Sequence, residues 1–248
     1  MWSVWSESVD IYLGQGVTML KIPHQEAQRI QHPVTWPLER VLAQLAEVLS
    51  QGGTQHRLQR RTLQITLSGA LCPATGFKAP QEVRRWNELR QIAHASAAAT
   101  WGVEADQIVC DMDAGGRGIT ASVGTVWMQT LQRWAAGHHW RIASLRPLWA
   151  VATQSPRARQ TDALGLLIHE PDAITAIADG AHGEAIASTL AGDYGQASGQ
   201  ALVRRWLVGL GLREDGLLHL NFGIRAQTAM PLGLKAWAAY WSTSAETP

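Results

Sequence analysis

The first residues that could do chemistry lie in VDIYLGQGVTMLKI, residues 9–22, which reads as a β-hairpin turning at Gly14 and Gly16. Glycine lets a backbone approach a ligand closely, so such a turn could bring N–H groups to a phosphate. A Gly-x-Gly pair is half of a phosphate motif, and a metal-dependent site would also need a carboxylate. Tyr12 instead supplies a phenol, which is uncharged at neutral pH. Asp10 lies two residues earlier, about 6–7 Å back along the strand.

A second candidate is the pair Asp111 and Asp113 in IVCDMDAGG, residues 108–116. Their spacing resembles the Asp-x-Asp of haloacid-dehalogenase-type phosphohydrolases, in which one carboxylate is the nucleophile and the other an acid–base, both beside Mg²⁺. That family has Thr or Val two residues after the second Asp, where this chain has Gly115. We favour a glycine-rich hairpin turn. The alternative is a small Mg²⁺-dependent phosphotransferase or phosphohydrolase with a degenerate site around Asp10, Asp111 and Asp113.

Histidine and cysteine patterns predict no metal centre. The best histidine pairs are adjacent in the sequence: His138–His139 and His169–Glu170. Neighbours in a strand point to opposite faces, so neither pair converges on one ion. Cys72 and Cys110 match no metal-ligand spacing and are expected to be small core residues. Because no Ser-His-Asp or Cys-His set can be assembled either, we expect no catalytic residue and no cofactor.

The composition describes a globular protein without a strong electrostatic partner. Of 248 residues, 46% are hydrophobic and 17% are charged, and the net charge is +1. Bulk attraction to nucleic acid or to anionic lipid is therefore not expected. The apolar runs are shorter than the about 20 residues of a membrane helix, and the N-terminus has no signal-type core. The sequence thus favours a cytoplasmic location.

Tryptophan is unusually frequent, with 12 Trp against 2 Phe and 3 Tyr. Its large apolar surface and single N–H donor suit both protein cores and partner surfaces. Trp2, Trp5, Trp237 and Trp241 lie near the chain ends, where burial must come from docking onto the body or onto a partner. We take these four residues, together with Tyr12, as candidate partner contacts.

Hydrophobic periodicity predicts a mixed α/β fold in two lobes. Residues 24–37 are polar and proline-marked, which predicts a loop. Helices are expected at about 38–51, 80–100, 125–136, 149–153, 196–212 and 231–241. Strands are expected at about 61–72, 106–113, 118–124, 139–148, 163–170, 173–180, 183–192 and 216–224. The polar, basic stretch 153–162 divides a first lobe with an inserted subdomain, residues 1–155, from a second lobe, residues 156–248.

This order of elements resembles the actin-like, ribonuclease-H-like fold of actin and the sugar kinases. Within that fold it is most similar to the pilus-assembly protein PilM and to the cytoplasmic domain of the type II secretion protein GspL. Residues 9–22 resemble the first phosphate hairpin of the family, and ALGLLIHEPDAITAIADG, residues 163–180, resembles the second. Residues 131–152 resemble the helix–strand–helix that joins the lobes. The chain is shorter than a full actin-like protein and is near the size of a secretion-type cytoplasmic domain, which lacks part of that fold.

The chain departs from the nucleotide-binding pattern of this family at both hairpins. ATP-binding relatives carry Asp-x-Gly in the first hairpin, where the carboxylate holds the water shell of Mg²⁺, and Tyr12 stands at that point. In the second hairpin residues 168–170 replace Asp-x-Gly, and Pro171 removes a backbone donor. The resemblance therefore implies a degenerate phosphate hairpin of which Tyr12, Gly14 and Gly16 are the site residues.

On this resemblance we expect a pseudo-ATPase: a non-catalytic scaffold or adaptor of a type IV pilus or type II secretion-like assembly. It would bind a segment of a membrane-anchored component or of an assembly ATPase, along a groove or by strand addition. The expected location is cytoplasmic, peripheral to the inner membrane through that partner, with no nucleic acid and no direct membrane insertion. Assembly with further copies of the chain, as a homo-oligomer, is left open.

Overall fold

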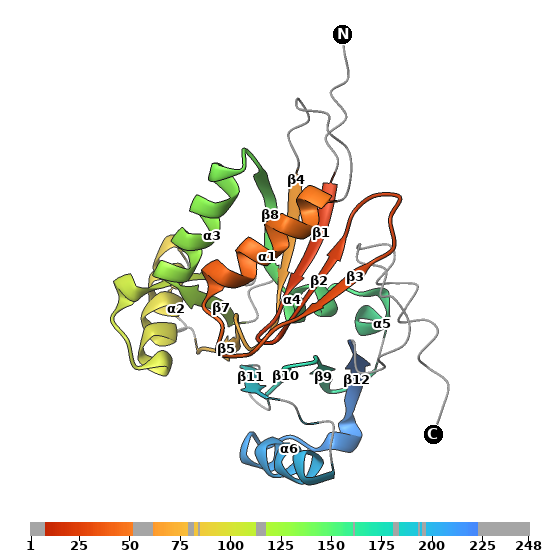
Figure 1. The fold of residues 1–248 in the computed structure, drawn as a ribbon. Coiled ribbons are helices and arrows are strands. Elements are labelled where there is room, and N and C mark those ends of the chain that lie inside the picture. Colours follow the sequence, from red (N-terminus) through yellow and green to blue (C-terminus); the bar gives the residue numbers. More distant parts are fainter. Residues whose placement is uncertain are drawn as a thin grey trace.

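Among the residues that the structure describes, three β-sheets form the fold in this computed structural model (Figure 1). We call them the N-terminal, middle and C-terminal sheets, after the order in which their first strands occur in the chain. Strands and helices mix along the sequence, so the predicted α/β class is confirmed. The structure describes residues 8–51, 62–78, 82–83, 85–112, 118–160, 162–180, 184–192, 194 and 197–222.

The N-terminal sheet has the strand order β3-β2-β1-β4-β8. Its strands are β1 (Ser8–Leu13), β2 (Val17–Lys21), β3 (Gln28–Gln31), β4 (Thr62–Leu67) and β8 (Arg141–Pro147). β1 pairs antiparallel with β2, as the hairpin predicted over residues 9–22 requires, and parallel with β4. Since β1 and β4 are parallel neighbours, their carboxyl ends lie at the same edge of the sheet, and this edge carries the site described below.

Helices α1 (Leu38–Gln51) and α3 (Thr125–Gly137) cover one face of the N-terminal sheet (Figure 1). Apolar side chains recur at helical spacing in α1 and at every second position in β4, so each element presents one apolar face. These faces meet in one buried cluster that includes Leu42, Leu45, Leu49, Leu63, Ile65 and Leu67. The predicted faces of both elements are therefore confirmed.

The middle sheet is small and has the order β5-β7-β6. Its strands are β5 (Ala74–Gly76), β6 (Ile108–Met112) and β7 (Ile119–Gly124), and α2 (Trp86–Trp101) and a short 3₁₀ turn η1 (Ala105–Gln107) precede β6. α2 is followed by Gly102, whose φ of 66° is the left-handed conformation that glycine commonly adopts at the end of a helix. The helix begins at Trp86 and not near residue 80, because the backbone of Arg85 is extended.

The C-terminal sheet has the order β11-β10-β9-β12 and packs against one helix, α6. Its elements are β9 (Gly165–His169), β10 (Ala173–Asp179), β11 (Ala185–Ala191), α6 (Ala197–Gly209), the 3₁₀ turn η2 (Glu214–Gly216) and β12 (Leu217–Asn221). The three consecutive strands, the helix and the final strand agree with the prediction for this half. β11 lies against β5 of the middle sheet, where a Cβ atom added to Gly76 would come within 2.6 Å of the Ala185 carbonyl oxygen.

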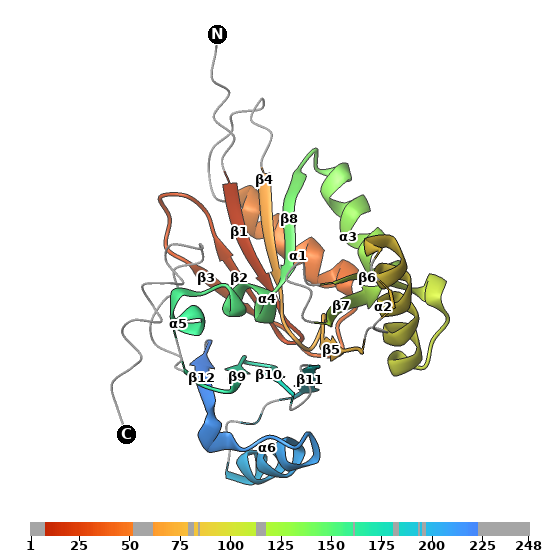
Figure 2. The same cartoon turned by 180° about the vertical axis from the view of Figure 1, so that it is seen from behind.

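Two short helices connect the N-terminal and C-terminal sheets: α4 (Leu148–Thr153) and α5 (Pro156–Arg159). The stretch 153–162, predicted as a polar boundary, therefore contains a helical turn. Ser155 caps this turn by accepting a hydrogen bond from the Ala158 N–H at 3.1 Å, and Pro156 fits the first helical position. Figure 2 shows α4 on the face of the N-terminal sheet opposite α1.

A buried apolar cluster joins the N-terminal and C-terminal sheets directly. Its members come from the first hairpin, from β5 and β7, from α4 and from the C-terminal sheet: Tyr12, Val17, Met19, Ala74, Ile119, Leu148, Trp149, Ala152, Leu166, Ile168, Ile177, Leu220 and Phe222. Trp149 anchors α4 here, because its indole Nε1–H donates a hydrogen bond to the Cys72 carbonyl at 3.0 Å. We call this group the inter-sheet cluster.

Two strands lie where the sequence predicts none. β3 falls inside the predicted loop 24–37; its residues QRIQ are mostly exposed and form an edge strand held by pairing with β2. β5 has three residues, too few for a period-2 pattern to show. The predicted closing helix, residues 231–241, lies outside the described residues.

Candidate functional site

The candidate site is the place where the β1–β2 turn, the segment after β4 and the β9–β10 turn meet. Its members are Tyr12, Gln15, Ser68, Gly69, Glu170 and Asp172, which we call the carboxylate contact. The first four residues lie at the edge where the parallel strands β1 and β4 end. The two acids lie in the β9–β10 turn of the C-terminal sheet, so the contact joins segments that are more than 100 residues apart.

Asp172 binds both segments of the N-terminal sheet. The Gln15 backbone N–H and the Ser68 hydroxyl both donate to Asp172 Oδ2, the latter at 2.9 Å. Gly14 is so close that an added Cβ atom would lie 2.9 Å from the same oxygen. A glycine is therefore required where the turn approaches this carboxylate.

Glu170 is also bound by a donor of the N-terminal half, and it is more deeply buried than Asp172. The Gly69 backbone N–H donates to both of its carboxyl oxygens, at 3.1 and 3.0 Å. Glu170 is 4% exposed although it is an acid. Because a buried carboxyl group is stable only when it is hydrogen bonded, Gly69 and Tyr12 are what make this position tolerable.

Tyr12 lies between the two acids and is 2% exposed. Its hydroxyl oxygen is 3.1 Å from Glu170 Oε2 and 3.2 Å from Asp172 Oδ1. Its ring belongs to the inter-sheet cluster. The residue expected to offer a partner contact is thus enclosed, and in this structure it serves contacts within the chain.

Burial controls the electrostatics of the site. It raises the pKa of Glu170 well above its ordinary value, and the neighbouring Asp172 raises that pKa further. Burial also raises the pKa of Asp172, although the hydrogen bonds from Gln15, Ser68 and Tyr12 oppose the shift. The pKa of the Tyr12 phenol rises well above 10 through burial and the two adjacent acids. For Glu170 and Tyr12 burial therefore favours the uncharged form.

The donors of this site are already used by carboxyl groups. The N–H groups of Gln15 and Gly69 and the hydroxyl of Ser68 are the kind of donors that would bind phosphate oxygens, and each points at an acid of the same chain. Ser68 donates to Asp172 as a nucleophile would to a base, but Ser68 is fully buried, so its hydroxyl is not accessible from the surface. The arrangement binds two parts of the chain together.

The predicted site residues fall at or beside this contact. Tyr12 and Gly14 touch the acids, while Gly16 has a φ of 154° and approaches Val34 instead. Ser68, Gly69 and Asp172 also belong to the contact, although the sequence does not indicate a site role for them. The only sequence feature that could identify Ser68 and Gly69 as site residues is their position directly after the buried strand β4.

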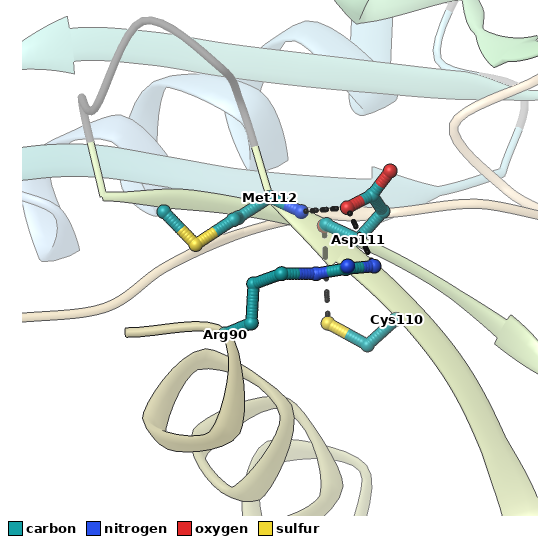
Figure 3. Close-up of polar contacts among 4 residues, drawn as sticks. All are labelled: Arg90, Cys110, Asp111 and Met112. Carbon is teal, nitrogen blue, oxygen red and sulfur yellow. Dashed lines mark hydrogen bonds and ion pairs between the residues drawn. The ribbon is translucent and has the colours of Figure 1, made fainter. Parts of the chain in front are cut away.

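Asp10 and Asp111, two of the three aspartates of the alternative hypothesis, lie on different sheets. Asp10 lies on β1, and burial raises its pKa to about 6 while Lys21 across the hairpin opposes the shift. Asp111 lies on β6 of the middle sheet, where its exposed carboxylate pairs with Arg90 at 3.4 Å and accepts the Met112 N–H at 3.0 Å (Figure 3). Asp113 lies outside the described residues.

Within the described residues, no group of three or more His, Cys, Asp or Glu could hold a metal ion. His169 and His219 stack across β9 and β12 with 3.2 Å between Nε2 and Nδ1, and burial lowers the pKa of His169 to about 4. His138 stacks on Trp140. Cys72 is buried, as expected, and Cys110 is partly buried; both thiols are free.

The four tryptophans predicted to contact a partner, Trp2, Trp5, Trp237 and Trp241, lie outside the described residues. On the far side of the C-terminal sheet, a groove of about 540 Å³ runs between α6 and η2. Its apolar floor includes Leu207, Val208 and Leu212. Its rim carries two ion pairs, Arg204–Glu214 at 3.0 Å and Arg213–Asp215 at 2.7 Å, so its charges are balanced.

The arrangement of the three sheets places the chain in a known fold class. No protein-family model and no curated protein matches its sequence. Solved structures match, and one of them is a Bacteroides thetaiotaomicron protein with an actin-like ATPase fold and unknown function. It is 11% identical, with a TM-score of 0.56 over 92% of this chain and 87% of that chain. The fold is therefore actin-like, as the sequence predicts.

Two further structures define the type of actin-like fold. One is the cytoplasmic domain of EpsL, an inner membrane component of the type II secretion system of Vibrio cholerae. It is 11% identical, with a TM-score of 0.55 over 98% of this chain and 97% of that chain. The other, from the PilM–PilN type IV pilus biogenesis complex, is 11% identical, with a TM-score of 0.51 over 96% and 70%. The predicted GspL and PilM type of fold is thus confirmed, and at these identities the likeness concerns the fold alone.

No helix among the described residues combines the length and the apolar character that crossing a membrane requires.

Proposed function

We propose that the chain is a non-catalytic actin-like scaffold, acting on the cytoplasmic side of a type IV pilus or type II secretion-like assembly. The carboxylate contact carries this proposal. Glu170 and Asp172 already accept the hydrogen bonds that the hairpin turn and the segment after β4 could offer to a phosphate group. The inter-sheet cluster behind them packs the two sheets together with apolar side chains.

A nucleotide would have to displace both acids. Each displaced acid would lose the donors that make its burial tolerable, and a buried polar group left without a partner costs about 1–3 kcal/mol. Phosphates would then lie beside the carboxylate of Asp172, and charges of the same sign repel each other strongly in a poorly solvated site. Tyr12 offers no anionic oxygen to a magnesium ion. Binding of Mg-ATP is therefore opposed by contacts that are complete without it.

The first test is isothermal titration calorimetry of the full chain with Mg-ATP. We expect no saturable heat, because the donors of the site are engaged within the chain. An active actin-like ATPase titrated under the same conditions is the positive control. Binding with micromolar affinity would overturn the pseudo-ATPase part of the proposal.

The second part of the proposal is that the chain binds a segment of a membrane-anchored or ATPase component through its terminal tryptophans. The structures of the EpsL cytoplasmic domain and of the PilM–PilN complex support a partner of this kind. The chain would then be held at the inner membrane by this partner. We also propose that the lobes divide at residues 155 and 156, between the two connecting helices and close to the Ser155 cap.

Co-purification with the membrane proteins encoded beside its gene tests this part. The full chain should recover one such component, and replacing Trp2 and Trp5, or Trp237 and Trp241, by Ala should reduce recovery about tenfold or more, as loss of interface anchors does. Trp86→Ala is the matched control, because Trp86 is 44% exposed on α2 and is expected to leave recovery unchanged. Recovery of no membrane or pilus component would contradict the proposal.

A further inference from the structure

The Tyr12 phenol has one hydrogen and two neighbouring acids, so it cannot make a full hydrogen bond to each of them unless one acid is protonated. The phenol oxygen lies within hydrogen-bonding distance of Glu170 Oε2 at 3.1 Å and of Asp172 Oδ1 at 3.2 Å. A phenol carries one hydrogen and therefore donates one full hydrogen bond, while an ionised carboxylate only accepts. With both acids ionised, the single phenol hydrogen would be shared between them. Two full hydrogen bonds form only if one acid carries a proton and donates it to the phenol oxygen.

The remaining partners decide which acid carries this proton. Asp172 Oδ2 accepts from two donors, the Gln15 N–H and the Ser68 hydroxyl, and such donors stabilise an ionised carboxylate. Glu170 has one N–H donor, from Gly69, and is more deeply buried than Asp172. The neutral form therefore belongs to Glu170, and the ionised form to Asp172.

The surroundings of Glu170 contain nothing that would hold its negative charge. From β1 it faces the Tyr12 phenol, from its own turn Asp172, and from the segment after β4 the Gly69 N–H and the Cys72 thiol. Thr175 and Thr189, on β10 and β11, lie against the same glycine and are neutral. Among the described residues that affect Glu170 there is no cation.

We propose that the carboxylate contact is a proton-dependent lock between the two sheets. Glu170 donates its proton to the Tyr12 oxygen, and Tyr12 donates its own to Asp172 Oδ1, so that the phenol on β1 links both acids of the β9–β10 turn. When Glu170 loses its proton, two carboxylates compete for one phenol hydrogen, and their repulsion loosens the contact. This inference concerns the same residues as the proposed function but needs neither a partner nor a nucleotide.

The direct test is NMR of the full chain labelled with carbon-13, in which the carboxyl carbon of Glu170 is followed during a pH titration. Its signal is assigned by its loss in Glu170→Gln. An ordinary Glu titrates at about pH 4.3. We expect the Glu170 carbon to keep the shift of a protonated acid at neutral pH, because burial and Asp172 raise the pKa of this group. Titration of the Glu170 carbon near its ordinary pKa would overturn the proton assignment.

A second measurement uses the stability of the fold. The folded protein holds one proton more than the unfolded chain at pH values between the unfolded pKa of Glu, about 4.3, and its raised folded pKa. In that window the unfolding equilibrium constant of the wild type should rise about tenfold per pH unit relative to Glu170→Gln, which keeps a neutral side chain at all pH values. At more acidic pH this pH dependence disappears, because Glu170 is then protonated in both the folded protein and the unfolded chain.

Glu47→Gln is the matched control, because Glu47 lies on the exposed face of α1. Its pH profile should follow that of the wild type. Parallel profiles for the wild type and Glu170→Gln would contradict the lock. Binding of Mg-ATP would overturn the proposed function and leave the proton assignment standing, so the two failures can be distinguished.

Discussion

Gly69 is enclosed by three side chains at the centre of the carboxylate contact. A Cβ atom at this position would lie 2.8 Å from Thr175 Oγ1, 2.9 Å from Glu170 Oε1 and 3.0 Å from Thr189 Cγ2. The glycine N–H is the backbone donor to Glu170. A side chain here would therefore push the acid away from the donor that makes its burial tolerable.

We predict that Gly69→Ala destabilises the protein by about 1–3 kcal/mol, since the new methyl group overpacks the site. Chemical denaturation monitored by circular dichroism measures the change. Gly137→Ala is the control, because a Cβ atom at Gly137 meets nothing within 4 Å and alanine is the better helix former. An unchanged midpoint for Gly69→Ala would show that the contact is looser than the structure describes.

Also at the scale of residues, the sequence indicates the side of the site that lies in the first hairpin, but not the side that lies in the β9–β10 turn. Tyr12 and Gly14 could be found because the first hairpin is contiguous and resembles a phosphate hairpin. Asp172 could not, because its donors Gln15 and Ser68 are 157 and 104 residues away in the sequence. Pro171-Asp172 reads as a turn by itself, and only the packing of the two sheets gives the carboxylate its role.

At the scale of elements, agreement follows the strength of the periodic pattern. α1, α3 and β4 have clear periodic patterns, and they occur close to where the sequence predicts them. β9, β10 and β11 do not alternate; they are short runs of mostly apolar residues between turn residues, and this signal also places them close to their predicted positions. β3 has four residues with no alternation, so its pairing with β2 decides its structure. The helix predicted over about 80–100 starts too early, because α2 begins at Trp86, whose side chain is 44% exposed. The buried face of α2 is made by Ala93, Ala97 and Ala98.

At the scale of the whole molecule, the inter-sheet cluster makes the two halves of the chain interdependent. Neither half can bury its share of that cluster alone, since Tyr12 and Met19 come from one half and Ile168 and Leu220 from the other. Exposing such apolar side chains costs about 25 cal/mol per Å² of surface. We therefore expect the two halves on either side of the predicted boundary, at residues 155 and 156, to unfold together.

We predict one cooperative unfolding transition, with coincident midpoints in near-UV and far-UV circular dichroism. Ile168→Ala, at a fully buried position of the cluster, should lower the free energy of unfolding by about 2–5 kcal/mol without splitting the transition. Val208→Ala, at a side chain that is 74% exposed on α6, should change it by less than about 0.5 kcal/mol. Two separate transitions would mean that the halves are independent units.

Cys72 gives the molecule an internal reporter of movement between its sheets. Its carbonyl oxygen accepts the Trp149 indole bond, its side chain is buried, and burial raises the pKa of its thiol to about 12. A thiol in that state reacts with alkylating reagents only after it becomes exposed, whereas Cys110 is partly accessible throughout. The alkylation rate of Cys72 would therefore measure how often this region opens in the intact protein, without any label being introduced.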